Sequence, residues 1–146
     1  MIRKGTLNDL SEIWKIEERV FRTPWSKESL QDELRLRTDR NVFVYESEQI
    51  VAYIMIRLSE NEAQVLNIAV DLEYQHKGYG DRLLKYTLDE LGNETDVFLE
   101  VRESNLPAIK LYSDNDFEEI GVREQYYSDG EDAIVMKRKA MNYGLV

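Results

Sequence analysis

The stretch from Leu66 to Leu84 constrains the fold of this chain more than any other. An apolar run ends at Val70, a short polar loop containing Gly78 and Gly80 follows, and an amphipathic pattern begins at once. This order predicts a strand, a glycine-containing loop and a helix. The first N–H groups of a helix have no partner inside it, and the helix dipole is positive there. The loop is therefore suited to hold a phosphate or pyrophosphate.

Spacing excludes two other phosphate loops. A P-loop reads G-x-x-x-x-G-K-[ST], but here Lys77 precedes Gly78 and Tyr79 replaces the hydroxyl residue. A dinucleotide-binding loop reads G-x-G-x-x-G, but Leu83 replaces its third glycine. The pattern that fits is Q/R-x-x-G-x-G/A, formed by Gln75-His76-Lys77-Gly78-Tyr79-Gly80. The alternative is an ordinary loop with a helix-starting glycine, and the flanking strand and helix favour the anion site.

The remaining patterns predict a single mixed α/β domain over residues 1–140, in which helices flank a central sheet, and a tail over Met141–Val146. Helices are expected over Leu7–Phe21, from the capping residue Ser26 through Leu34 and Leu36, over Gly80–Leu91, and from the capping residue Asn105 through Tyr112. Strands are expected at Met1–Gly5, Asn41–Ser47, Ile50–Leu58, Ala63–Val70, Asp96–Val101, Glu118–Gln125 and Asp132–Lys139. The element order is β-α-α-β-β-β-α-β-α-β-β.

Charge and composition narrow the classes of partner. The formal net charge is −10, which disfavours nucleic acid as a partner and would steer a cationic substrate favourably, although acidity for solubility explains the charge equally simply. No apolar run approaches the length of a membrane span, and Met1–Gly5 lacks the apolar segment of a signal peptide. The absence of cysteine excludes a cysteine acyl-enzyme and suits a cytoplasmic protein.

Several motifs together resemble one enzyme family. The Gln75–Gly80 hexapeptide resembles the acyl-CoA pyrophosphate loop of the GNAT superfamily of N-acyltransferases, whose element order is the one predicted above. Further segments resemble the N-terminal protein acetyltransferase branch of this superfamily, and within it the RimI-type enzymes. These segments are Thr23–Ser26, Leu99–Asn105, Ala108–Tyr112, Asp116-Phe117, Gln125–Tyr127 and Glu131–Met136. The resemblance implies a GNAT fold and acetyl-CoA as cosubstrate. It also implies transfer to the α-amine of a basic protein, the N-terminal alanine of a small-subunit ribosomal protein. No metal is expected, because the chain has one histidine, no cysteine and no cluster with ligand spacing.

The resemblance also implies roles for individual residues. Glu100, near the carboxyl end of a predicted strand, becomes the general base; the alternative is a surface glutamate paired with Arg102 or a lysine. Tyr112 becomes the general acid for the leaving thiolate; the alternative is an aromatic core residue. Backbone N–H groups near Ile68–Val70, on a strand that splays from its neighbour in this fold, become the oxyanion donors. The cofactor-binding residues are then Ile68, Ala69, Val70, Gln75, His76, Lys77, Gly78, Tyr79, Gly80, Asp81, Asn105 and Tyr112.

The acceptor is expected across the cleft from the cofactor. Trp25, Tyr126 and Tyr127 are candidates to wall a peptide N-terminus, since aromatic side chains offer large contact area with few rotamers to freeze. The alternative for these residues is a role in packing or in a strand. Acidic residues of the Asp129–Asp132 turn would attract a cationic substrate or merely form a polar turn. Two other functions stay open: acetylation of a lysine or a small amine, and a non-catalytic acyl-CoA-binding module.

Overall fold

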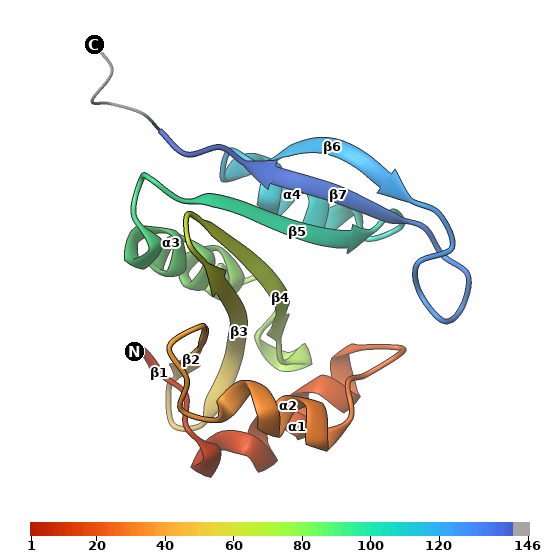
Figure 1. Cartoon of the computed structure of the whole chain (residues 1–146). Coiled ribbons are helices and arrows are strands. Elements are labelled where there is room, and N and C mark those ends of the chain that lie inside the picture. The colour runs from red at the N-terminus through yellow and green to blue at the C-terminus, as the bar shows by residue number, and fades with distance from the viewer. Residues whose placement is uncertain (142–146) are drawn as a thin grey trace.

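The computed structural model describes residues 1–141, which form a mixed sheet covered by helices (Figure 1). The strands of this sheet, in the spatial order β1-β2-β3-β4-β5-β7-β6, are β1 (Ile2–Lys4), β2 (Arg40–Glu46), β3 (Ile50–Ser59), β4 (Glu62–Val70), β5 (Asp96–Arg102), β7 (Ala133–Arg138) and β6 (Glu118–Arg123). The α-helices are α1 (Leu10–Val20), α2 (Lys27–Leu34), α3 (Tyr79–Leu91) and α4 (Leu106–Asp114), with short 3-10 turns at Leu7–Asp9 and Leu72–Tyr74. The mixed α/β prediction and the predicted element order are confirmed.

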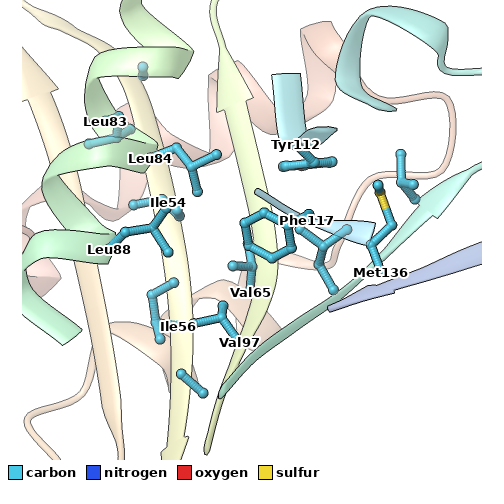
Figure 2. Packing of buried hydrophobic residues seen from close by; sticks show 14 of the residues in the cluster. Ile54, Ile56, Val65, Leu83, Leu84, Leu88, Val97, Tyr112, Phe117 and Met136 are labelled. Carbon is cyan, nitrogen blue, oxygen red and sulfur yellow. The ribbon is translucent and has the colours of Figure 1, made fainter. Parts of the chain in front are cut away.

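The two faces of the sheet carry separate cores. Successive side chains of a strand point to opposite faces, so Tyr53 and Met55 of β3 pack under α1 and α2, whereas Ile54 and Ile56 pack under α3. The α3 and α4 side includes Leu83, Leu84, Leu88, Val65, Val97, Tyr112, Phe117 and Met136 (Figure 2). Because β3 is buried on both faces, its apolar residues are continuous rather than alternating.

A bulge in β4 shapes the site. β4 pairs antiparallel with β3 along its length, but its register shifts where Asn67 faces Met55 and Val65 faces Ile56. Leu66 is the extra residue, and such a bulge bends and twists its strand. On its other edge β4 pairs with β5, in the one parallel pairing of the described sheet, over Glu62–Val65 and no further. Beyond the bulge, β4 and β5 diverge (Figure 1).

The predicted boundaries hold to within a residue, except at the ends of α2, of α4, which continues past Tyr112 to Asp114, and of β6, where the predicted strand Glu118–Gln125 stops at Arg123 and Gln125 has a left-handed φ of 50°. Ser26 and Asn105 cap α2 and α4 as predicted, accepting hydrogen bonds from the N–H groups of Ser29 at 3.1 Å and Ala108 at 3.2 Å. The prediction that α2 continues through Leu36 is wrong. The helix ends at Leu34, the last residue that contacts the core, and the side chain of Leu36 is 91% exposed. Within residues 1–141 no helix is long and apolar enough to span a membrane. Residues 142–146 of the predicted tail lie outside the described residues.

Candidate active site

A cavity of about 600 Å³ opens where β4 and β5 diverge. Its lining comes from both ends of the sequence, including α1, the loop after it, β4, the loop before α3, β5, α4 and the β6–β7 loop. The parallel pairing ends at Val65 and Leu99, whereas β4 continues to Val70 and β5 to Arg102. The facing edges of Ile68–Val70 and Glu100–Arg102 are therefore not paired with each other. The splay that the family resemblance implies is present, and it follows directly after the bulge.

The loop before α3 has the backbone geometry of an anion site. His76 and Gly78 adopt left-handed conformations, with φ of 62° and 88°, and such residues are typical of backbone loops that bind anions. The first helical hydrogen bond runs from Arg82 N–H to Gly78 C=O at 3.1 Å, which leaves the N–H groups of Tyr79, Gly80 and Asp81 without partners in the helix. His76 occupies a conformation that is costly for a residue with a Cβ atom.

Glycine at position 80 leaves space for a ligand. A Cβ atom there would lie 3.5 Å from Val70 Cγ2 and 3.7 Å from Leu111 Cδ2, so a methyl group fits but a branched side chain would extend into this space. The loop is held against β4 by Gln75, whose Nε2 donates to the carbonyl of Val70 at 3.0 Å. These contacts fit a loop whose backbone approaches a pyrophosphate closely.

Three of the predicted cofactor-binding side chains have other partners. The carboxylate of Asp81 pairs with Lys85 at 2.7 Å and accepts a hydrogen bond from Asn115 at 3.0 Å. Its side chain is therefore occupied, and the backbone N–H in the first turn of α3 is the group that Asp81 can offer to a cofactor. Asn105 lines the cavity but uses its amide oxygen as the cap of α4. Lys77 does not line the cavity, and its ammonium lies over the ring of Tyr74. The other predicted cofactor-binding residues line the cavity.

Glu100 lies on the cavity wall with its side chain 14% exposed. Its Oε1 pairs with Arg123 Nε at 2.8 Å, rather than with the Arg102 or lysine partner that the surface alternative suggested. The phenol of Tyr126 donates a hydrogen bond to the same carboxylate, which raises the pKa of Tyr126. Tyr126 thus contacts the candidate base without lining the cavity itself.

Tyr112 is both a core residue and a cavity residue. Its ring packs edge-to-face against Phe117 with centroids 5.8 Å apart, and the residue also lines the cavity. Burial raises the pKa of the Tyr112 phenol well above its ordinary value. The hydroxyl therefore stays protonated at every working pH and is available as a hydrogen-bond donor to a developing thiolate. The two alternatives that the sequence offered for Tyr112 are thus compatible.

Trp25 and Tyr127 form part of the opposite wall, from the loop after α1 and from the β6–β7 loop. The acidic residues of the second loop have partners in the protein. Asp129 and Glu131 accept hydrogen bonds from Arg102, and Asp132 accepts one from the Gln125 N–H. These contacts favour the polar-turn interpretation of this segment over attraction of a cationic substrate.

Glu17 is a cavity residue that the sequence patterns did not single out. The residue is 1% exposed and lines the cavity from α1. Its carboxylate accepts hydrogen bonds from the Tyr53 phenol, from Asn67 Nδ2 at 2.6 Å and from the Trp25 backbone N–H at 2.9 Å. Burial raises the pKa of Glu17, against the lowering effect of these hydrogen bonds. Its one sequence signal is its position four residues after Ile13 on the apolar face of α1.

A splayed parallel strand pair, followed by a glycine-containing anion loop at a helix N-terminus, defines the class of acyl-CoA-dependent acyltransferases. The chain belongs to the acetyltransferase (GNAT) family, whose family model matches residues 10–117. The mixed sheet with its flanking helices is the GNAT fold, as predicted.

Relatives with assigned names are similar over most of the chain. The [ribosomal protein bS18]-alanine N-acetyltransferase of Salmonella typhimurium is 36% identical, over 88% of this chain and 89% of that protein. An N-alpha-acetyltransferase of Sulfurisphaera tokodaii is 33% identical, over 92% of this chain and 90% of that protein. The crystal structure of the ribosomal-protein-S18-alanine N-acetyltransferase from Escherichia coli superposes with a TM-score of 0.89 at 32% identity, covering 100% of this chain and 98% of that one.

Proposed function

We propose that this protein transfers an acetyl group from acetyl-CoA to the α-amine of a protein N-terminus. The observation that carries the proposal is the single cavity that connects the anion loop around Gly78 to Glu100 and Tyr112, and then to the wall formed by Trp25 and Tyr127. Such a cavity can hold a cofactor at one end and an acceptor at the other. Bound acetyl-CoA would supply an activated acetyl thioester.

The residues of the chain suit direct transfer. Glu100 would accept the proton that the amine loses, directly or through water. Those backbone N–H groups of Ile68–Val70 that point to the β5 side of β4, where pairing with β5 has ended, would donate to the carbonyl oxygen as negative charge develops on it. The Tyr112 hydroxyl would donate to the departing sulfur. Because the chain contains no cysteine, a cysteine-bound acyl group is not available, and we expect a ternary complex rather than ping-pong kinetics.

An N-terminal amine is an easier acceptor than a lysine. The pKa of an α-amine is about 7.7–8.0 and that of a lysine about 10.4, a difference of roughly 2.5 units or about 3.5 kcal/mol. A carboxylate is a weak base, so the enzyme gains most from an acceptor that loses its proton readily. Together with the relatives that act on ribosomal protein bS18, this favours the N-terminal alanine of that basic protein in the cytoplasm as the substrate.

The test is acetyl transfer to matched peptides, followed by mass spectrometry. One peptide has a free N-terminal alanine and no free lysine, and the other has the same sequence with a blocked N-terminus and one free lysine. We expect the first to be acetylated faster, and recombinant bS18 with an exposed alanine to be acetylated as well. Faster acetylation of the lysine peptide would contradict the proposal and indicate that the enzyme acetylates lysine side chains. Binding of acetyl-CoA with no transfer to any amine would identify a non-catalytic module.

A further inference from the structure

We propose that Arg102 is a positioning residue that ties together the two loops walling the acceptor end of the cavity. The inference rests on the function proposed above, because it assigns the acceptor to that end. One loop follows α1 and carries Thr23 and Trp25; the other joins β6 to β7 and carries Tyr127, Asp129 and Glu131. In Figure 1 both loops project on the same side of the molecule, beyond the diverging ends of β4 and β5.

The guanidinium of Arg102 has separate contacts for each loop. Its Nη2 donates to Thr23 Oγ1 at 2.8 Å, across 79 residues of sequence. Its Nη1 donates to Asp129 Oδ2 and to Glu131 Oε1, each at 2.8 Å. The plane of the guanidinium also lies near the ring of Tyr127, with Cζ 4.1 Å from the ring centroid. Arg102 therefore contacts both walls, and an exposed ion pair between Arg22 of the first loop and Asp129 of the second, at 3.7 Å, is a weaker link between them.

Arg102 belongs to β5, the strand that also carries the candidate base. Arg102 is the last residue of β5 and lies two positions after Glu100, so both side chains point to the same face of the sheet. Asp129 and Glu131 are themselves held by the turn: Asp129 Oδ1 accepts from the Glu131 N–H at 3.1 Å, and Glu131 Oε2 accepts from the Ser104 N–H at 2.9 Å. The bridge thus sets both walls relative to Glu100.

The charges support a positioning role rather than direct attraction of the substrate. Hydrogen bonds from Ser104 and Arg102 lower the pKa of Glu131 to about 2, so this carboxylate is charged at every working pH. The Arg102 side chain is 17% exposed, and two carboxylates neutralise its charge. A bidentate, planar guanidinium suits this geometry, whereas a lysine ammonium could not reach both loops in the same way.

The test compares Arg102→Met, Arg102→Lys and Thr23→Val with the parent. Thr23 is exposed, and valine keeps its shape while it removes the hydroxyl that accepts from Arg102. We expect the KM for an N-terminal acceptor peptide to rise about tenfold in Arg102→Met and about threefold in Thr23→Val, because each loses a hydrogen bond to a charged group. The KM of Arg102→Lys should lie between the KM of Arg102→Met and that of the parent. The Kd for acetyl-CoA, measured by calorimetry, should stay at the parent value, and kcat should change less than KM.

Matched variants and a second readout separate the possible explanations. Thr23→Ser keeps the hydroxyl and should restore the parent KM, and Arg35→Met, which breaks an exposed ion pair with Asp32 on α2, should leave KM unchanged. Hydrogen exchange should speed up in both loops of Arg102→Met, even if the parent fails to acetylate N-terminal peptides, in which case the proposed function alone is lost. Unchanged exchange in the loop containing Thr23, or a parent KM in Thr23→Val, would overturn the inference.

Discussion

At the scale of single residues, the base proposed for the reaction is a carboxylate that already has partners in the protein. Glu100 is paired with Arg123 and also accepts a hydrogen bond from Tyr126, so it is held in one orientation at the cavity wall. Such contacts fix geometry, and a base that is positioned correctly contributes about 10²–10⁴-fold to a rate. Tyr112 differs, because burial keeps its hydroxyl protonated over the whole working range of pH.

The two side chains should therefore respond differently to pH. We expect Glu100→Gln to lower kcat by about 10²-fold or more, with the greatest loss below the amine pKa of about 8, where most of the acceptor still carries its proton. Tyr112→Phe should lower kcat by a similar factor at every pH, because its proton is present throughout. Steady-state kinetics across this range checks both expectations. A Glu100→Gln enzyme with the parent pH–rate profile would remove Glu100 from the role of base.

Glu17 offers a prediction about stability. Its pKa is raised in the folded protein above the ordinary value of 4.5, so its favourable contribution to folding is complete below that value and is lost as pH rises through the folded pKa. Glutamine at this position is neutral at all pH values. We expect the free energy of unfolding of Glu17→Gln to be within about 1 kcal/mol of the parent value at acid pH, and to exceed the parent value increasingly as the pH rises above 4.5. Denaturant titrations below and above this pH measure the difference. A relative stability that falls with pH would contradict the assigned shift.

At the scale of elements, local patterns predict more than long-range contacts do. Capping by Ser26 and Asn105 and the helix start near Gly78 depend on a few adjacent residues, which is why the sequence predicts them. The bulge at Leu66 depends on the pairing of β4 with β3, and no local pattern marks it. The ion pair between Glu100 and Arg123 joins two strands that are not adjacent in the sheet, so the sequence predicted the residue but not its partner. The two residues predicted beyond Leu34 are not helical, because Leu36 has no core to contact.

The loop before α3 provides the prediction at this scale. Alanine at position 80 would make ordinary contacts with Val70 and Leu111, whereas the methyl groups of valine would extend past them into the cavity. We expect Gly80→Ala to bind acetyl-CoA nearly as well as the parent. Gly80→Val should bind at least about tenfold more weakly, a loss of about 1.4 kcal/mol, while keeping its circular dichroism spectrum. Calorimetry that finds equal affinity in a folded Gly80→Val protein would show that the pyrophosphate lies elsewhere.

At the scale of the whole molecule, one parallel pairing within an antiparallel sheet creates the site. β4 and β5 start together and separate after the bulge, so a cavity forms between strands rather than on a surface, with helices α1 and α3 on opposite faces. The loops that contain Thr23 and Tyr127 reach this cavity from the two ends of the sequence, and Arg102 contacts both. Motifs spread along the chain could predict that these segments meet, but not which side chains connect them.

The net charge of −10 acts at this same scale. Arg102 offsets only part of the negative charge of Asp129 and Glu131, so attraction of a basic acceptor would come from the acidic protein as a whole, this turn included. Salt screens such attraction as the Debye length falls from about 30 Å at 0.01 M to about 10 Å at 0.1 M. We expect kcat/KM for an alanine-starting peptide rich in arginine to fall several-fold over this range. A peptide with glutamine in place of each arginine should show little change. Equal salt dependence for the two peptides would mean that the acidity of the protein serves solubility rather than recruitment of its substrate.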